Sequence, residues 1–236
     1  MIYVLLALGV ITLFLYIHEK VKACSLKATI LKSVVSVFFI SVAVCALVMA
    51  NPQDNALVTA VLVTMGLVFG LLGDIWLDLK YVFPERDEPF SYAGFTVFGV
   101  GHILYMTGML LSYFPKGRPL WVIVPLVLAV AMSFGNLLLE KPMKLSYGKM
   151  KPICIIYGIL LFATLLLSGS LAICYGWQEK MLNFMFIGAV LFTLSDLVLS
   201  GTYFGVGKDR PVDIILNYLT YYPAQFVIAL SILFLA

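Results

Sequence analysis

Long apolar runs, each followed by a short polar or proline-containing segment, recur along the whole sequence. Water-facing side chains could not cover them, because 63% of the 236 residues are hydrophobic and only 11% are charged. In hydrocarbon every backbone N–H and C=O must be paired within the protein, so a spanning segment is a helix or part of a closed barrel. Barrel strands alternate apolar and polar residues, and these runs do not. The sequence therefore predicts an all-α integral membrane protein.

Eight of the runs are long enough to cross the membrane, since a helix needs about 20 apolar residues to span the hydrocarbon. The predicted spans are residues 1–17, 33–50, 56–79, 92–114, 119–139, 152–175, 181–200 and 212–236. No connection between them can hold a second domain, so we expect residues 1–236 to form a single polytopic membrane domain. The first span has lysines after it and no basic residue before it, the reverse of a secretory signal, and we expect it to be retained.

The distribution of Lys and Arg predicts the orientation, because cytoplasmic loops carry an excess of these residues. Twelve of the 15 lie in the odd-numbered loops, and the exceptions are Lys116, Arg118 and Lys180. We therefore expect the odd loops to be cytoplasmic, both termini to lie outside, and the chain to reside in the cytoplasmic membrane. Because the basic residues are scattered along loop edges, the net charge of +3 reflects topology and does not indicate a nucleic-acid partner.

The third and seventh spans resemble each other, which predicts an internal repeat. At an offset of 122 residues the matched positions are Gly66 and Gly188, Val68 and Val190, Leu72 and Leu194, Asp74 and Asp196, Leu77 and Leu199, and Tyr81 and Tyr203. Four spans separate the partners, so both would run in the same direction. This favours a 4+4 parallel repeat with halves 1–115 and 116–236. Two apolar helices can match at Leu and Val by chance, but a shared intramembrane Asp is harder to obtain that way.

Four ionisable groups inside the predicted spans stand out, because burial makes each of them costly. They are Asp74 and Asp78 in the third span, His102 in the fourth and Asp196 in the seventh. Asp78 is nearest to a span end, where water could solvate it. The other three lie at similar depth, so we expect one cavity between the third, fourth, seventh and eighth spans, opening toward the cytoplasmic leaflet.

Two interpretations of these groups stay open at this point. A neutral carboxylic acid near an ionised carboxylate is a general acid/base pair. Intramembrane polar residues also pair simply to hold helices together. Their surroundings follow helical spacing: Tyr105 lies three residues after His102, and Tyr218, Tyr222 and Gln225 form one stripe. In the third span, Gly66, Gly70 and Gly73 allow close packing against a neighbour.

Other catalytic classes lack support in the sequence. There is no GxSxG, HExxH, P-loop or GxGxxG motif. Two histidines and four cysteines without CxxC spacing make a metal site or a disulfide an unfavoured interpretation. We therefore expect neither a metal nor a cofactor.

Four short motifs occur in order along the chain. They read Gly73-Asp74 to Leu77, His102 to Tyr105, Leu191-Phe192 to Ser195-Asp196 to Leu199, and Ala224-Gln225 to Ile228-Ala229 and Ser231. Lys151-Pro152 followed by Tyr157 adds a fifth. In these residues the chain resembles the lysoplasmalogenase-like, or YhhN-type, membrane family over nearly its whole length. One departure is that the family often opens the second span with Lys-Pro, where this chain has Lys32-Ser33.

The resemblance implies hydrolysis of the vinyl ether of lysoplasmalogens, with a lysophospholipid as substrate and membrane lipids as surroundings. The products would be a fatty aldehyde and glycerophosphoethanolamine or glycerophosphocholine. Asp74 and Asp196 would supply acid and base, and His102 would share the proton or position water. Substrate binding would involve Lys32, Asp78, Arg210, Tyr105, Tyr157, Tyr222 and Gln225. The alternative function is a proton-coupled transporter or a lipid-binding membrane protein, because parallel repeats with mid-membrane carboxylates also suit transport.

Overall fold

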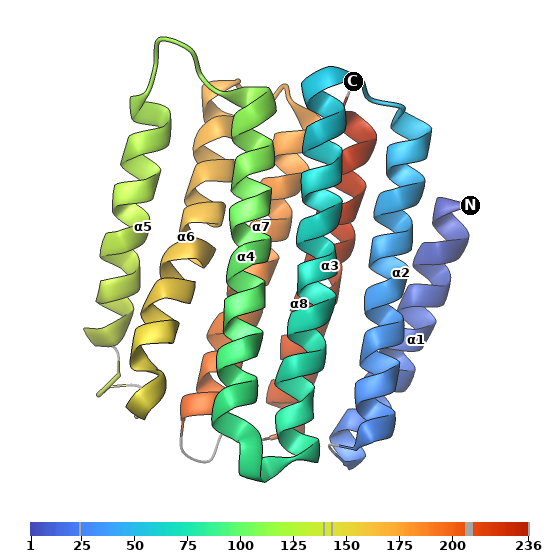
Figure 1. Ribbon diagram of the computed structural model, residues 1–236, viewed down its shortest axis with the longest axis vertical. Coiled ribbons are helices and arrows are strands. Elements are labelled where there is room, and N and C mark those ends of the chain that lie inside the picture. The colour runs from blue at the N-terminus through green and yellow to red at the C-terminus, as the bar shows by residue number, and fades with distance from the viewer. Residues whose placement is uncertain (24, 139, 143, 206–209, 236) are drawn as a thin grey trace.

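The computed structural model is a bundle of long helices running between two ends (Figure 1). It describes residues 1–236 except 24, 139, 143, 206–209 and 236. Within the described residues the long helices are α1 (Ile2–Lys22), α2 (Leu26–Ala50), α3 (Asp54–Val82), α4 (Asp87–Tyr113), α5 (Leu120–Leu138), α6 (Lys151–Cys174), α7 (Lys180–Phe204) and α8 (Pro211–Ser231). Short 3-10 turns occur at Pro84–Arg86, Gly148–Met150 and Ile232–Phe234.

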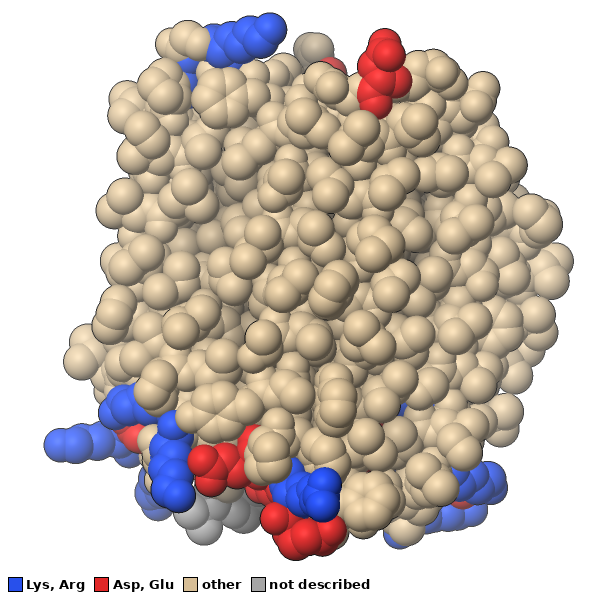
Figure 2. All heavy atoms as spheres, in the orientation of Figure 1, with Lys and Arg blue, Asp and Glu red and all other residues tan. Residues whose placement is uncertain are grey.

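The surface of the bundle fits a membrane. By length and composition, α1 to α7 are each apolar enough to cross one. The remaining long helix, α8, carries Asp213, Asn217 and Gln225, and its inner face is buried against the other helices. Figure 2 shows charged side chains gathered at the two ends, with an uncharged belt between them on the face in view. The chain is therefore a multi-pass helical membrane protein.

One end of the bundle, here called the basic end, carries the α1–α2, α3–α4, α5–α6 and α7–α8 connections (Figure 1). Most of the Lys and Arg residues visible in Figure 2 lie there. That this end faces the cytoplasm stays a prediction, and Lys208 lies outside the described residues.

The helices divide into a packed centre and two edges. The antiparallel pairs α3–α4 and α7–α8 make the largest contacts, α6 joins α4 to α7, and α2 packs against α3 and α8. At the edges, α1 packs on α2 and α8, and α5 packs mainly on α6 (Figure 1). Helices α3 and α7 run in the same direction, toward the basic end. The 4+4 repeat itself stays a prediction.

The predicted span ends were wrong by several residues in several places, most clearly around the first connection. Helix α1 continues to Lys22, and α2 begins at Leu26, where the Ser25 hydroxyl accepts a hydrogen bond from the Ala28 N–H. Lys32 therefore lies inside α2 and not in a loop. The charge does not end the helix, because Lys32 turns inward and is paired there (see below). At the other terminus, α8 ends at Ser231 and a 3-10 turn follows.

Close packing along α3 depends on glycine. A Cβ atom built on Gly66 would lie 2.3 Å from a ring carbon of Tyr105, and one on Gly73 would lie 2.4 Å from the Phe98 ring. At Gly70 the nearest atom would be the Gln225 side-chain nitrogen, at 2.8 Å. These glycines let α4 and α8 bring their side chains against the α3 backbone.

We expect Gly66→Ala to destabilise the protein by about 1–3 kcal/mol, the usual cost of overpacking. The added methyl group meets the buried Tyr105 ring, which has no space to move into. Thermal unfolding of the purified protein in detergent measures the effect. The matched control is Gly135→Ala on α5, where a Cβ atom meets nothing within 4 Å. Equal unfolding temperatures for the two variants would contradict the packing argument.

Candidate functional site

Asp74 of α3 and Asp196 of α7 line the same pocket, which we call the central pocket. It comprises about 400 Å³ of space not filled by protein atoms, counting the part open to the surroundings. Besides α3 and α7, its walls come from α2, α4, α6 and α8; the residues that matter below are Lys32, Phe95, Tyr157, Asn217 and Tyr221. The pocket therefore involves α2 and α6 in addition to the four helices expected from the sequence.

The carboxylate of Asp74 is surrounded by donors. Its Oδ2 accepts hydrogen bonds from the Ser36 hydroxyl at 2.7 Å and the Tyr221 hydroxyl at 2.9 Å. Its Oδ1 lies 3.3 Å from the Lys32 ammonium. The side chain is 2% exposed. Two hydroxyl donors and a cation favour the ionised form of this carboxyl group.

Asp74 belongs to a buried charge cluster formed by Lys20, Lys32, Asp74 and Asp78. Asp78 Oδ1 lies 2.9 Å from the Lys20 ammonium and 3.2 Å from the Lys32 ammonium. The expectation that water solvates Asp78 was wrong, because the side chain is 1% exposed. Two ammonium groups balance two carboxylates, so the cluster has no net charge. Buried ions of this kind persist only when they are paired in this way.

Asp196 has a different environment. Its Oδ2 accepts a short hydrogen bond from the Tyr157 hydroxyl. Among the residues that the structure describes, no Lys or Arg lies within ion-pair distance of it. An unpaired carboxylate in apolar surroundings is costly, whereas a neutral carboxylic acid is much less so. The second carboxyl group of the pocket is therefore suited to carry a proton.

His102 does not line the central pocket. Its Nδ1 lies 3.1 Å from the Thr164 hydroxyl of α6, and its Nε2 has no hydrogen-bond partner among the described residues. The ring packs against Tyr157, with 5.7 Å between the ring centres, and against Phe192, with 5.0 Å. Its nearest connection to the pocket is thus the tyrosine that binds Asp196.

A chain of side chains links Asp74 to α4. The Gln225 amide nitrogen donates to the Tyr221 hydroxyl at 2.9 Å, and Tyr221 donates to Asp74. The Tyr105 hydroxyl reaches the Gln225 oxygen at 3.5 Å, a long hydrogen bond. On the same side, Tyr222 donates to the backbone oxygen of Lys32 at 3.3 Å. The central pocket is not lined by Tyr105, Tyr222 or Gln225. These residues instead support the residues that line it.

Two residues that donate hydrogen bonds to Asp74 were not predicted from the sequence. Ser36 lies four residues after Lys32 and so on the same face of α2. Tyr221 lies four residues before Gln225 and so on the same face of α8. Helical spacing from a residue already singled out would have found both.

A polar vestibule at the basic end borders the central pocket. It encloses about 900 Å³ between α1, α3, α7 and α8, counting the part open to the surroundings, and Lys20, Lys22, Asp213 and Asn217 contribute polar groups to it. Arg210, expected near a phosphate, forms an ion pair with Asp213 at 2.9 Å. Four residues line both spaces: Leu199, Tyr203, Asn217 and Tyr218.

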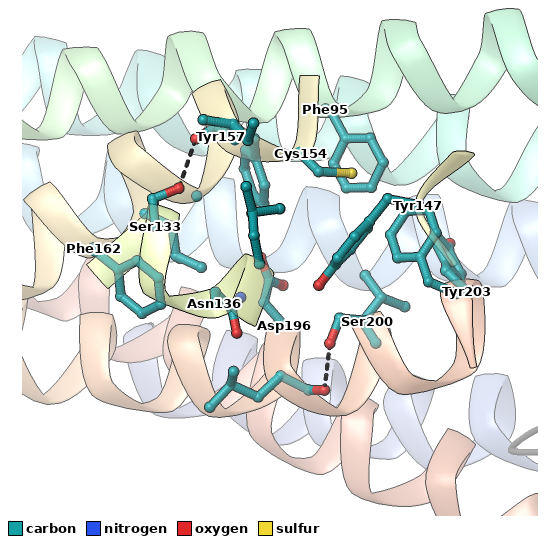
Figure 3. Close-up of a pocket in the computed structure, with 17 residues that line it drawn as sticks. Phe95, Ser133, Asn136, Tyr147, Cys154, Tyr157, Phe162, Asp196, Ser200 and Tyr203 are labelled. Atoms are coloured by element: carbon teal, nitrogen blue, oxygen red, sulfur yellow. Dashed lines mark hydrogen bonds between the residues drawn. The ribbon is translucent and has the colours of Figure 1, made fainter. Parts of the chain in front are cut away.

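A second space borders the central pocket, and Figure 3 shows the residues that line it. This lateral groove lies between α4, α5, α6 and α7 and encloses about 650 Å³, counting its open part. It shares five residues with the central pocket: Phe95, Tyr157, Asp196, Leu199 and Tyr203. Asp196 therefore lies where the groove and the pocket meet.

At the basic end of the groove the α5–α6 connection is held by an ion pair. The Lys151 ammonium lies 2.8 Å from Glu140 Oε2, and this hydrogen bond lowers the pKa of the Glu140 carboxyl. Tyr147 packs on Phe204 with 4.8 Å between ring centres, and its burial raises its pKa. These contacts close the groove toward the basic end.

Comparison with known proteins gives one match. The model of the YhhN family matches residues 28–232. The match begins within α2 and includes every residue of the central pocket. No curated protein and no solved structure matches the chain.

Proposed function

The chain belongs to the YhhN family, and from that premise we propose that it is a membrane-embedded hydrolase that cleaves the vinyl ether bond of lysoplasmalogens. One observation carries the proposal: two carboxyl groups in contrasting environments line one pocket. One is paired with a cation, and the other has no cation partner among the described residues. Such a contrast is how a site obtains an acid and a base from the same residue type.

Vinyl ether hydrolysis needs both groups. A proton adds to the β-carbon of the vinyl group, and the α-carbon becomes an oxocarbenium ion. Water adds to the α-carbon and loses a proton, which gives a hemiacetal. The hemiacetal hydroxyl then loses a proton to form the aldehyde carbonyl, while the bond to the glycerol oxygen breaks and that oxygen takes up a proton. The products are a fatty aldehyde and a glycerophospho head group, and one water molecule has been consumed.

Asp196 is the proposed proton donor. Tyr157 donates to its Oδ2, which leaves Oδ1 free of described hydrogen bonds and able to present a proton to the substrate. Without a neighbouring described cation, the neutral acid is the form that these half-buried, mostly apolar surroundings favour. As the proton leaves, the Tyr157 hydroxyl stabilises the carboxylate that remains.

Asp74 is the proposed base. Lys32, Ser36 and Tyr221 keep it ionised in the resting protein. A negative charge at this position stabilises the oxocarbenium ion and then accepts the proton from water. The proposed source of that water is the vestibule at the basic end, which shares four lining residues with the central pocket.

His102 is a positioning residue in this scheme. It packs on the Tyr157 ring and is anchored by Thr164. We expect His102→Gln to lose less turnover than a change at either Asp, because the chemistry does not pass through the imidazole. The variant for comparison is Tyr157→Phe. It removes the hydrogen bond from Tyr157 to Asp196, whose geometry His102 is proposed to fix. If His102→Gln lost as much turnover as Asp196→Asn, the histidine would have to act on the proton itself.

Aldehyde release tests the function. Purified protein in detergent is supplied with a 1-alkenyl lysophospholipid, and the fatty aldehyde is measured by mass spectrometry. The saturated 1-alkyl ether cannot be protonated at carbon and serves as the matched control. Aldehyde from the alkenyl lipid alone is the expected result. No aldehyde from well-folded protein would overturn the proposal, and proton-coupled lipid uptake by proteoliposomes without aldehyde would favour the transport alternative.

A further inference from the structure

We propose that the lateral groove between α5, α6 and α7 holds the hydrocarbon chain of the substrate and is the path by which that chain reaches the central pocket from the bilayer. This inference rests on the proposed function, because it places the chain of the lipid that the central pocket cleaves. The residues used to test it have no part in the acid/base chemistry.

The position of the groove fits a chain attached to the reacting bond. Asp196, the proposed proton donor, lines both the groove and the central pocket, and so does Tyr157, which binds it. A lipid whose vinyl ether lies at Asp196 has its glycerol on one side and its hydrocarbon chain on the other. The polar vestibule is lined by α1, α3, α7 and α8 and the lateral groove by α4, α5, α6 and α7, so each borders the central pocket with a different set of helices.

The chemistry of the groove fits hydrocarbon. Away from Asp196 its deep part is lined by Leu161 and Phe162 of α6. Its two serine hydroxyl groups are already used: Ser133 donates to the backbone oxygen of Ile155, and Ser200 donates to that of Leu197, each at 2.9 Å (Figure 3). Hydroxyl groups that already donate to the backbone have no hydrogen left to donate to a polar ligand. The apolar walls instead favour binding of a hydrocarbon chain from water or from the bilayer.

The packing of α5 gives the groove its opening. This helix packs mainly on α6 and hardly touches α7, so Asn136 and Leu137 on α5 face Leu197 and Ser200 on α7 across the groove. Helix α5 lies at the edge of the bundle, where its outer side chains are exposed and apolar (Figure 1). In a membrane this side meets lipid, while Tyr147 and Phe204 cover the basic end. The opening is therefore directed to the acyl chains of the bilayer.

Leu197 provides a test that leaves the core intact. Its side chain is 42% exposed and borders the groove, so Leu197→Trp narrows the opening without disturbing buried packing. Leu194 is the matched control, since it lies one turn earlier on the same helix, is 47% exposed and lies outside the groove. Both variants are assayed with hexadecenyl and butenyl lysophospholipids of the same head group.

We expect Leu197→Trp to lower kcat/KM for the hexadecenyl substrate about tenfold or more and to leave the butenyl substrate nearly unchanged, as in other pockets that select by apolar size. Leu194→Trp should have nearly the same kcat/KM as the unsubstituted protein for both substrates. Equal effects on the two substrates, or no effect on either, would overturn the groove assignment while aldehyde release upheld the proposed function.

Photo-crosslinking provides a readout that does not depend on turnover. A 1-alkyl ether lysophospholipid with a diazirine near the chain end is bound, irradiated, and located by peptide mass spectrometry. Label on the α6 segment around Leu161 and Phe162 is the expected result. Label confined to α1 or to the vestibule would overturn the assignment. If crosslinks map to the groove but no aldehyde forms from alkenyl lipid, the chain site stands and the proposed function fails.

Discussion

Asp74→Asn and Asp196→Asn should each lower the turnover of a lysoplasmalogen at least about 10²-fold, a typical general acid–base contribution. Asn keeps the size and much of the hydrogen bonding of Asp but neither delivers nor accepts a comparable proton. At position 196 the amide can still accept from Tyr157, so we expect the bundle to fold. At position 74 the amide keeps an oxygen for Ser36 and Tyr221, although it no longer balances Lys32.

The measurement is aldehyde release under saturating substrate, with folding checked by gel filtration and thermal unfolding. Asp54→Asn is the matched control, because Asp54 is exposed at the end of α3 farthest from the basic end. Unchanged turnover in both well-folded variants would rule out the assignment of acid and base. Loss of folding in both would favour the alternative in which the carboxyl groups only hold helices together.

Hydrolysis in heavy water tests the same assignment, because the position of deuterium in the aldehyde shows which carbon received the proton. The proton delivered to the β-carbon comes from an exchangeable acid, so aldehyde formed in heavy water and quenched quickly should carry one deuterium at carbon 2. Turnover should also fall, since that proton transfer makes the unstable cation and is the slow step. Aldehyde without deuterium at carbon 2 would exclude carbon protonation as the route.

Lys32→Met should destabilise the protein by about 3–5 kcal/mol, because removing one partner of a buried ion pair leaves charge uncompensated. The Lys32 ammonium lies within 3.3 Å of both Asp74 and Asp78, and its side chain is 5% exposed. Thermal and denaturant unfolding in detergent measure the loss. Lys27→Met serves as the matched control, since Lys27 pairs with Glu19 on the surface and is 69% exposed, and exposed pairs contribute little.

A second substitution separates charge from packing. Adding Asp74→Asn to Lys32→Met removes the carboxylate that is left without a cation, since Asp78 keeps Lys20, and we expect part of the lost stability to return. Simple loss of side-chain packing would instead make the double variant less stable than the single one. That outcome would contradict the charge argument.

The all-helical membrane fold was predictable from the length of the apolar runs, because hydrocarbon allows few other backbone structures. The ends of α1 and α2 were not. Hydropathy alone places Lys20 and Lys32 in a loop, because both side chains are charged. In the structure both residues lie in helices and form ion pairs with Asp78 of another helix. Such pairing depends on contacts between distant segments, which the local sequence does not contain.

The candidate site was also predictable from the sequence only in part. Asp74 and Asp196 were identified from the rarity of carboxyl groups in apolar spans and from their matching positions, and the structure places them around one pocket. Their different environments could not be read from the sequence, because Lys32, Ser36 and Tyr157 come from other helices. The lateral groove was also missed, since it arises from the way α5 packs on α6 alone.

The neutrality of the buried charge cluster has a consequence for how the protein responds to voltage. Lys20, Lys32, Asp74 and Asp78 sum to zero, so the transmembrane field exerts no net force on them. In the proposed cycle, Asp196 loses a proton and Asp74 gains one, so the site as a whole remains neutral. A field acts on moved charge, at about 2.3 kcal/mol per elementary charge per 100 mV, and here little charge crosses the membrane. Turnover in polarised vesicles should therefore be nearly independent of membrane potential, unlike that of a transporter that carries protons across the bilayer.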